Sequence, residues 1–175
     1  MTVIFVGLIA VFASVYLLVS SSVNGIKRKK EEYCAVVALL LYIRGALSSG
    51  GGRLCDMVRK FSSEPLEENG LLAVLRSDSV GNSRDSNEPE TSRAFFRNNL
   101  DKVRFLVDDE DAKKLVRYLR GYGKSYIEEE RKKLSEITDY FITREKSFSE
   151  KSERDIKTSW IVFAFAFVGA FILLI

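Results

Sequence analysis

Uncharged apolar residues are concentrated at the two ends of the chain. Residues 160–175 read WIVFAFAFVGAFILLI and carry neither charge nor proline, and residues 3–19 form a second apolar run. A helix rises about 1.5 Å per residue, so residues 158–175 make a helix of about 27 Å, close to the hydrocarbon thickness of about 30 Å. We therefore expect transmembrane helices over residues 1–22 and 158–175. A buried helix of a soluble core is the alternative for the second run.

Basic residues flank both apolar runs on the side that faces the middle of the chain. They are Lys27, Arg28, Lys29 and Lys30 after the first run, and Lys151, Arg154 and Lys157 before the second. Trp160 lies at the expected headgroup level. Because basic flanks stay on the cytoplasmic side, both runs place the middle of the chain in the cytoplasm and both termini outside the cell membrane. A signal peptide carries its positive charge before the apolar run, so signal-peptide cleavage near residues 20–22 is the less favoured alternative.

The polar middle of the chain, residues 23–157, shows helical periodicity. Apolar residues recur at spacings of three, four or seven, and no alternating strand pattern of useful length appears. These residues are Tyr33, Val36, Val37, Leu40, Ile43 and Leu47; Leu54, Met57, Val58 and Phe61; Leu71, Leu72 and Leu75 after Pro65; Phe96, Leu100, Val103 and Val107 after Ser92; Leu115, Leu119 and Tyr122; and Ile127, Leu134, Phe141 and Phe148. The expected fold is all-α, a cytosolic helical bundle flanked by two transmembrane helices, with a mobile loop over residues 76–91.

A turn is predicted where the last helix of the bundle begins. Gly121 and Gly123 can adopt left-handed backbone angles at little cost, and Ser125 followed three residues later by Glu128 is a capping box. One helix should end there and a long helix should run on into the second span. The alternative is a single unbroken helix over residues 112–175.

Composition excludes several classes of function. The chain has 175 residues, 46% hydrophobic and 29% charged, and its charged residues all lie between Lys27 and Lys157. The net charge of +3 is too small to indicate a nucleic-acid partner. The absence of histidine removes the commonest general base and metal ligand, and the glycines at 50–52 lack a phosphate-loop pattern. We expect no enzyme activity, cofactor, metal or small-molecule substrate, and we expect Cys34 and Cys55 to be buried thiols.

The order of these segments resembles the stage III sporulation protein AB family. The likeness lies in the apolar first helix of the middle followed by the stretch at residues 52–61, in the turn at residues 119–125, and in the closing GAFILLI with Gly169. The resemblance implies a cytosolic domain similar to type II secretion F-type platform proteins. It also implies a non-enzymatic platform of a secretion-like channel complex between mother cell and forespore during sporulation. The partners would be a cytosolic ATPase and other membrane components of that channel, with the protein in the mother-cell membrane.

Two other functions stay open. One is a generic two-span membrane adaptor or sensor whose cytosolic helical domain binds an unrelated protein. The other is a lipid-surface protein that uses the basic run at residues 27–30 for anionic headgroups, although membrane topology already explains that run.

Overall fold

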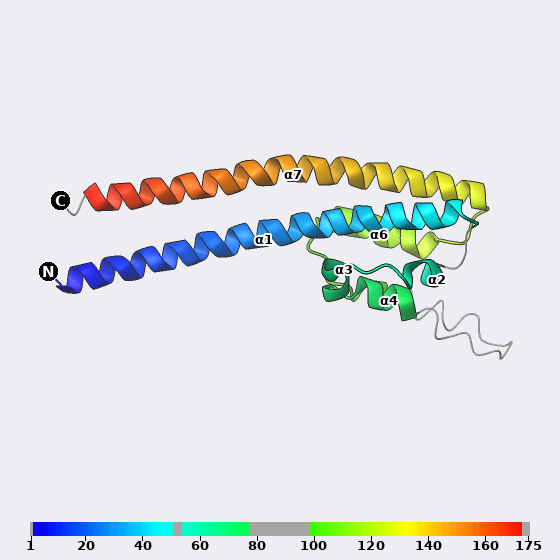
Figure 1. Ribbon diagram of the computed structural model, residues 1–175, viewed down its shortest axis with the longest axis horizontal. Coiled ribbons are helices and arrows are strands. Elements are labelled where there is room, and N and C mark those ends of the chain that lie inside the picture. The colour runs from blue at the N-terminus through cyan, green and yellow to red at the C-terminus, as the bar shows by residue number, and fades with distance from the viewer. Residues whose placement is uncertain (1, 51–53, 78–98, 173–175) are drawn as a thin grey trace. The chain divides into compact units, whose positions relative to one another are not determined.

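A computed structural model of the chain is all-helical, as the sequence predicts. It describes residues 2–50, 54–77 and 99–172, and the side chains of residue 7 and of residues 12–50, 54–77 and 99–169; no strand occurs in this part of the chain. The helices are α1 (Thr2–Ser48), α2 (Leu54–Val58), α3 (Glu64–Glu68), α4 (Leu71–Ser77), α6 (Asp109–Gly121) and α7 (Ile127–Ile172) (Figure 1).

The chain divides into two compact units. The terminal unit comprises Met1–Lys30 and Lys146–Ile175, and the central unit comprises Glu31–Glu145. Helix α1 continues without a break through Gly25 and the basic run at residues 27–30, so the predicted first span and the apolar positions from Tyr33 to Leu47 belong to one helix. The stretch contains no proline, and a single helix-interior glycine costs only about 1 kcal/mol relative to alanine.

Within the terminal unit, the two helical segments run antiparallel. The ring centroid of Phe12 lies 4.8 Å from that of Phe167, and the ring centroid of Tyr16 lies 6.0 Å from that of Phe163. Further along the pair, Lys30 Nζ lies 3.5 Å from Glu153 Oε1. The start of α1 and the end of α7 therefore lie at the same end of this unit (Figure 1).

The core of the central unit is built from one face of each helix. Helix α2 packs against α4, and α3 packs against α4. The fully buried side chains come from α1, α2, α3, α4, α6 and α7 and include Leu39, Leu40, Ile43, Val58, Leu66, Leu71, Leu72, Leu115, Leu119, Leu134 and Phe141. Most of the predicted apolar positions are thus core positions. Ile127 is an exception, because it is exposed at the first position of α7.

The predicted helix after Pro65 is split in two. Gly70 has a φ of 85°, a left-handed conformation that ends α3 before α4 begins at Leu71. The side-chain Oδ1 of Asn69 accepts a hydrogen bond from Leu71 N at 2.9 Å, so the turn is also closed by a side chain. The sequence pair Asn69–Gly70 carried this signal, since asparagine and glycine are typical turn residues.

The predicted helix over Phe96, Leu100, Val103 and Val107 is wrong beyond Leu100. Residues 103–106 are not helical, because their backbone is bonded to other parts of the core: Arg104 N donates to Asn69 O at 3.3 Å and Leu106 N donates to Glu32 Oε2 at 2.7 Å. Ser92 and Phe96, together with most of the predicted loop at 76–91, lie outside the described residues. Arg76 and Ser77 belong to α4.

The chain leaves the helical conformation between α6 and α7. Helix α6 ends at Gly121, α7 begins at Ile127, and Gly123 between them has a φ of 77°. A left-handed glycine of this kind is common just after a helix end. The alternative of one unbroken helix over residues 112–175 does not hold.

We expect Gly123→Ala to destabilise the protein by about 1–2 kcal/mol, because an L side chain is disfavoured at a left-handed backbone position. Gly121→Ala is the matched control: an added Cβ meets no atom within 4 Å at either glycine, but Gly121 is helical. This control should be neutral or stabilising by up to about 1 kcal/mol. Thermal unfolding followed by circular dichroism measures both, and equal effects would contradict the left-handed turn.

Candidate functional site

A fully buried carboxylate joins three helices of the central unit. Asp111, in the first turn of α6, accepts hydrogen bonds from the hydroxyls of Tyr33 in α1 and Tyr140 in α7, both at 2.5 Å. Arg144 of α7 donates from Nε to both carboxylate oxygens, at 3.0 and 3.2 Å. Hydrogen-bond donors from both long helices, α1 and α7, therefore bind this carboxylate.

Asp108 extends this group at the start of α6. Its Oδ2 lies 3.1 Å from Arg144 Nη2, and its backbone N–H donates to the Tyr33 hydroxyl at 3.2 Å. We call Tyr33, Asp108, Asp111, Tyr140 and Arg144 the Asp111 cluster. Charge-assisted bonds are stronger than neutral ones, and removing one partner of a buried ion pair is strongly destabilising. The cluster therefore fixes α1, α6 and α7 at one point.

The tyrosines of the cluster are permanent hydrogen-bond donors. Burial, reinforced by the hydrogen bond to Asp111, raises the pKa of Tyr33 well above its usual value. The hydrogen bond to Asp111 is the main cause that raises the pKa of Tyr140, whose ring also lies under Lys114 Nζ at 3.3 Å. Neither hydroxyl ionises near neutral pH. The arrangement is suited to holding the three helices together.

A second buried carboxylate sits one residue before Tyr33. Glu32 accepts hydrogen bonds from Asn69 Nδ2 at 2.8 Å and from the backbone N–H of Leu106 at 2.7 Å. It thereby ties α1 to the α3–α4 turn and to the segment that precedes α6. Sequence reasoning missed both Glu32 and Asp111. For Asp111 the available signal was its position on the helix: it lies four residues before buried Leu115 and eight before buried Leu119, on the same helix face.

The turn before α7 uses different residues from those of the predicted capping box. Ser125 N donates to Glu130 Oε1 at 3.3 Å, whereas Glu128 pairs with Arg131 at 3.1 Å. The role predicted for Glu128 is therefore wrong. The helix begins at Ile127, one residue later than a Ser125 cap requires, and buried Glu130 reaches back instead. Ser125 Oγ accepts a hydrogen bond from Lys133 Nζ at 2.6 Å.

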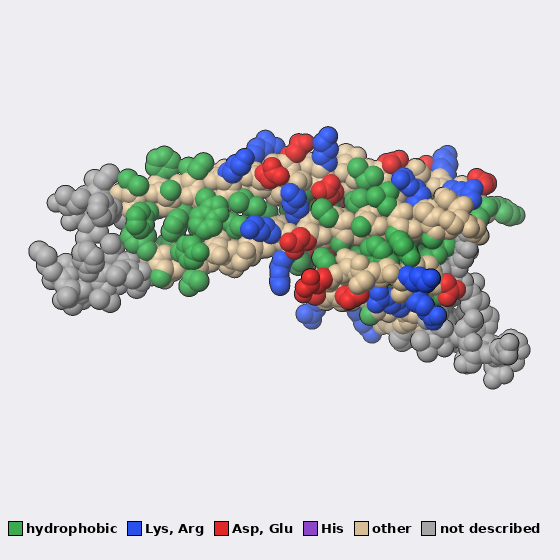
Figure 2. All heavy atoms as spheres, viewed as in Figure 1, with side chains coloured by type: hydrophobic (Ala, Val, Ile, Leu, Met, Phe, Trp, Pro, Cys, Tyr) green, Lys and Arg blue, Asp and Glu red, His purple; other side chains and the backbone are tan. Residues whose placement is uncertain are grey.

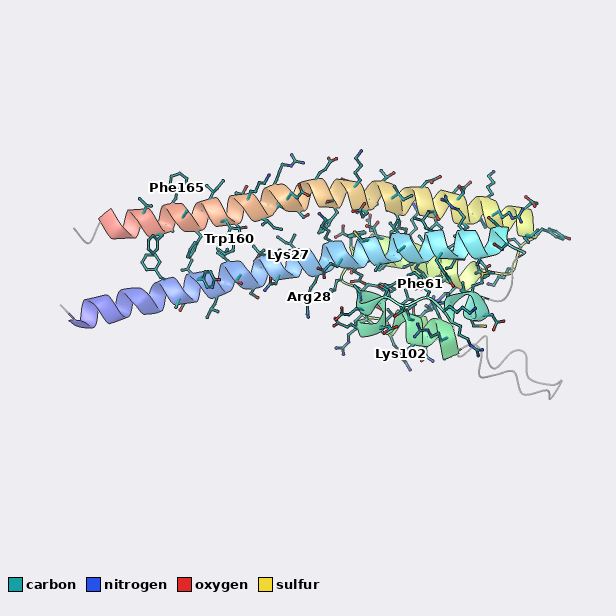
Figure 3. All side chains as sticks on the ribbon, viewed as in Figure 1. Lys27, Arg28, Phe61, Lys102, Trp160 and Phe165 are labelled. Carbon is teal, nitrogen blue, oxygen red and sulfur yellow. The ribbon has the colours of Figure 1, made fainter. Side chains whose placement is uncertain are left out.

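The residues predicted for the membrane interface all fall in the terminal unit. Trp160 is 38% exposed, with its ring centroid 6.0 Å from that of Tyr16. Figure 3 shows Lys27 and Arg28 projecting from opposite sides of α1. Lysine and arginine side chains adjoin a surface of hydrophobic side chains on this unit (Figure 2). The basic residues are Lys27, Arg28, Lys29 and Lys30 on α1, and Lys151, Arg154 and Lys157 on α7.

Three findings bear on the other predicted features. Within the described part of the chain, no helical segment combines the length and apolar content that a membrane crossing requires. The predicted spans extend beyond that part: residues 1 and 173–175 lie outside it, as do the side chains of 2–6, 8–11 and 170–172.

Among the described residues no group of acidic or cysteine side chains could hold a metal. Cys55 is buried as expected, but Cys34 is exposed on α1, because it lies off the buried face that Tyr33 and Val36 share.

Comparison with known proteins gives no relative. No family model matches the chain, and neither a curated protein nor a solved structure matches it significantly.

Asp111→Ala should lower the free energy of unfolding by at least about 2 kcal/mol, because it leaves the buried hydroxyl of Tyr33, the partly buried hydroxyl of Tyr140 and a guanidinium without their shared acceptor. Glu110→Ala removes an exposed carboxylate from the same helical turn and should cost no more than about 1 kcal/mol. Chemical denaturation of the two variants measures the difference. A loss for Asp111→Ala no larger than for Glu110→Ala would show that the cluster does not hold the helices.

Stability should fall as the pH rises above about 10. Burial raises the pKa of Tyr33 and Tyr118 in the folded state, so above that pH the unfolded chain loses phenolic protons that the folded chain keeps. Phenolate absorbance should show fewer than the chain's seven tyrosines titrating together in the folded protein, and all of them in denaturant. Ionisation of all seven near pH 10 with helix content intact would contradict the buried hydroxyls.

Proposed function

We propose that this protein is a non-enzymatic membrane scaffold. The terminal unit anchors the chain in the bilayer, and the central unit presents a rigid helical body on the cytoplasmic side. The single observation that carries the proposal is the antiparallel pairing of α1 and α7 in the terminal unit, marked by the contact of Phe12 with Phe167. This pairing brings the two uncharged ends of the sequence together. A two-helix membrane anchor with both termini outside requires its two helices to run antiparallel.

Exposed apolar side chains on the terminal unit support a lipid environment. Leu18 is 71% exposed and Phe165 is 74% exposed, and Phe165 points away from α1 (Figure 3). Other exposed apolar residues of this unit are Leu17, Ile161, Val162, Phe167 and Val168. Contiguous apolar surface of this kind marks a site that lipid or another protein covers. Lipid suits a surface that continues into uncharged sequence at both ends of the chain.

The interior of the central unit suits a scaffold. The buried acidic side chains of Asp111 and Glu32 are engaged in bonds between helices, and the tyrosines beside Asp111 are locked as donors. Bonds of this kind hold a fixed shape on which a partner protein can dock. This supports a structural role in preference to a reaction.

The narrower proposal is that the scaffold is a platform of a secretion-like channel between mother cell and forespore. It would act during sporulation, in the mother-cell membrane, with a cytosolic ATPase and other channel components as partners. This step rests on the resemblance to the stage III sporulation protein AB family alone. A two-span adaptor or sensor with an unrelated partner is the alternative. Expression confined to sporulation would favour the channel platform, and expression throughout vegetative growth would contradict it.

Thiol labelling tests the proposed topology. Cys34 is exposed on the central unit and Cys55 is buried, so a membrane-impermeant maleimide should modify Cys34 only after cells are lysed. Cys34→Ser should abolish the labelling, and a periplasmic or external marker cysteine confirms that the reagent is active on intact cells. Equal labelling of Cys34 before and after lysis would place the central unit outside the cytoplasm and exclude the proposed scaffold.

A further inference from the structure

Charge is divided unequally between the two units. The terminal unit holds eight Lys or Arg and three Asp or Glu, a net charge of +5, and the rest of the chain holds nineteen and twenty-one, a net charge of −2. Seven of the eight basic residues form what we call the basic collar: Lys27, Arg28, Lys29, Lys30, Lys151, Arg154 and Lys157. The net positive charge of the protein therefore comes from the terminal unit, where most of the basic residues lie in one short stretch of each long helix.

The two halves of the collar lie beside each other. Lys30 Nζ is 3.5 Å from Glu153 Oε1, and Lys29 Nζ lies 5.4 Å from the ring centroid of Phe148. Val23 on α1 and Ser152 on α7 are both buried. The positive-inside rule acts on the basic flank of each apolar run separately. The antiparallel pairing goes further, because it gathers both flanks around one pair of helices.

Little of this charge is neutralised within the unit. Lys30 forms an ion pair with Glu153, and both partners are partly exposed. Lys27, Arg28, Lys151 and Lys157 are exposed and form no ion pair in the described structure. Four cations are thus available to an external anion at the level where Trp160 and the exposed apolar side chains begin.

We propose that the basic collar binds the headgroups of anionic phospholipids and enriches them around the anchor. The inference rests on the proposed membrane anchorage. Anionic phosphates attract lysine and arginine near a bilayer surface, and each such cation strengthens the attraction about fivefold before salt screening. The surroundings of the collar favour a lipid partner over a nucleic acid. Exposed apolar residues such as Ile161 and Val162 adjoin the collar, and they could contact acyl chains while the basic side chains contact the headgroups.

An intrinsic fluorophore next to the collar can report which lipid surrounds it. Trp160 is the only tryptophan of the chain and lies beside the collar on α7. Full-length protein is reconstituted into vesicles of phosphatidylcholine and phosphatidylglycerol, in which one lipid or the other is brominated and quenches tryptophan fluorescence on contact. Quenching by either lipid reports insertion, and the ratio of the two quenching constants reports which headgroup surrounds Trp160.

The collar predicts a severalfold preference of the wild-type protein for brominated phosphatidylglycerol. The preference should fall to about one in the quadruple variant Lys27→Gln, Arg28→Gln, Lys151→Gln, Lys157→Gln. The matched control removes four exposed cations of the central unit, Arg59→Gln, Lys102→Gln, Lys113→Gln and Lys132→Gln, and should keep the preference. Inorganic phosphate should lower the preference no more than chloride does at equal ionic strength, which separates lipid headgroups from free phosphate.

Four other results would each contradict one part of the proposal. Equal quenching by both lipids in the wild-type protein would leave the anchor standing and refute the collar as a lipid site. Absence of quenching by either lipid would refute the anchor itself and the collar with it. Loss of the preference in the control variant would show that total charge, not the collar, attracts the lipid. Oligonucleotide binding in micelles that depends on the same four residues, without lipid preference, would assign the collar to nucleic acid.

Discussion

The carboxylate of Asp111 has to be neutralised inside the protein, and the geometry of the central unit follows from that requirement. A buried carboxylate without partners costs several kcal/mol. Here its partners come from α1 through Tyr33 and from α7 through Tyr140 and Arg144. Moving any of the three helices would break a bond to the charge. Apolar packing alone would allow the helices to slide past one another, whereas these hydrogen bonds form in only one alignment of α1, α6 and α7.

The terminal unit is held together differently. Its described contacts include aromatic pairs, such as Tyr16 with Trp160 and Phe163, and an ion pair at Lys30. Aromatic pairs contribute about 0.5–1.5 kcal/mol each beyond their buried area. Such contacts suit helices that lie in an apolar medium, where buried charge would be costly. Polar bonds thus set the shape of the central unit, whereas aromatic contacts join the two helices of the terminal unit, the part proposed as the anchor.

Apolar spacing predicted the all-helical fold and most of the core, because burial of one helix face imposes the three- and four-residue spacing seen at Val36, Leu40 and Ile43. It failed where bonds to distant residues replaced helical bonds. Residues 103–106 are not helical, because Leu106 N donates to the Glu32 side chain and Arg104 N donates to the backbone carbonyl of Asn69, and both partners are far away in the chain. The same holds for Asp111, which appears in the sequence as an ordinary acidic first turn. The Ser125–Glu128 signal located the turn approximately but named the wrong acidic residue, since the start of a helix shifts easily by one residue.

Cross-linking across the terminal unit in native membranes tests the proposed anchor most directly. In a chain with Cys34→Ser and Cys55→Ala, Phe12→Cys and Phe167→Cys should be joined by a short bismaleimide, because the native rings at these positions are 4.8 Å apart. Phe12→Cys with Phe165→Cys should not be joined, since Phe165 points away from α1 (Figure 3). The cross-linked chain should stay in the membrane pellet after alkaline carbonate extraction. Release of the protein into the supernatant, or equal cross-linking of both pairs, would contradict an antiparallel membrane anchor.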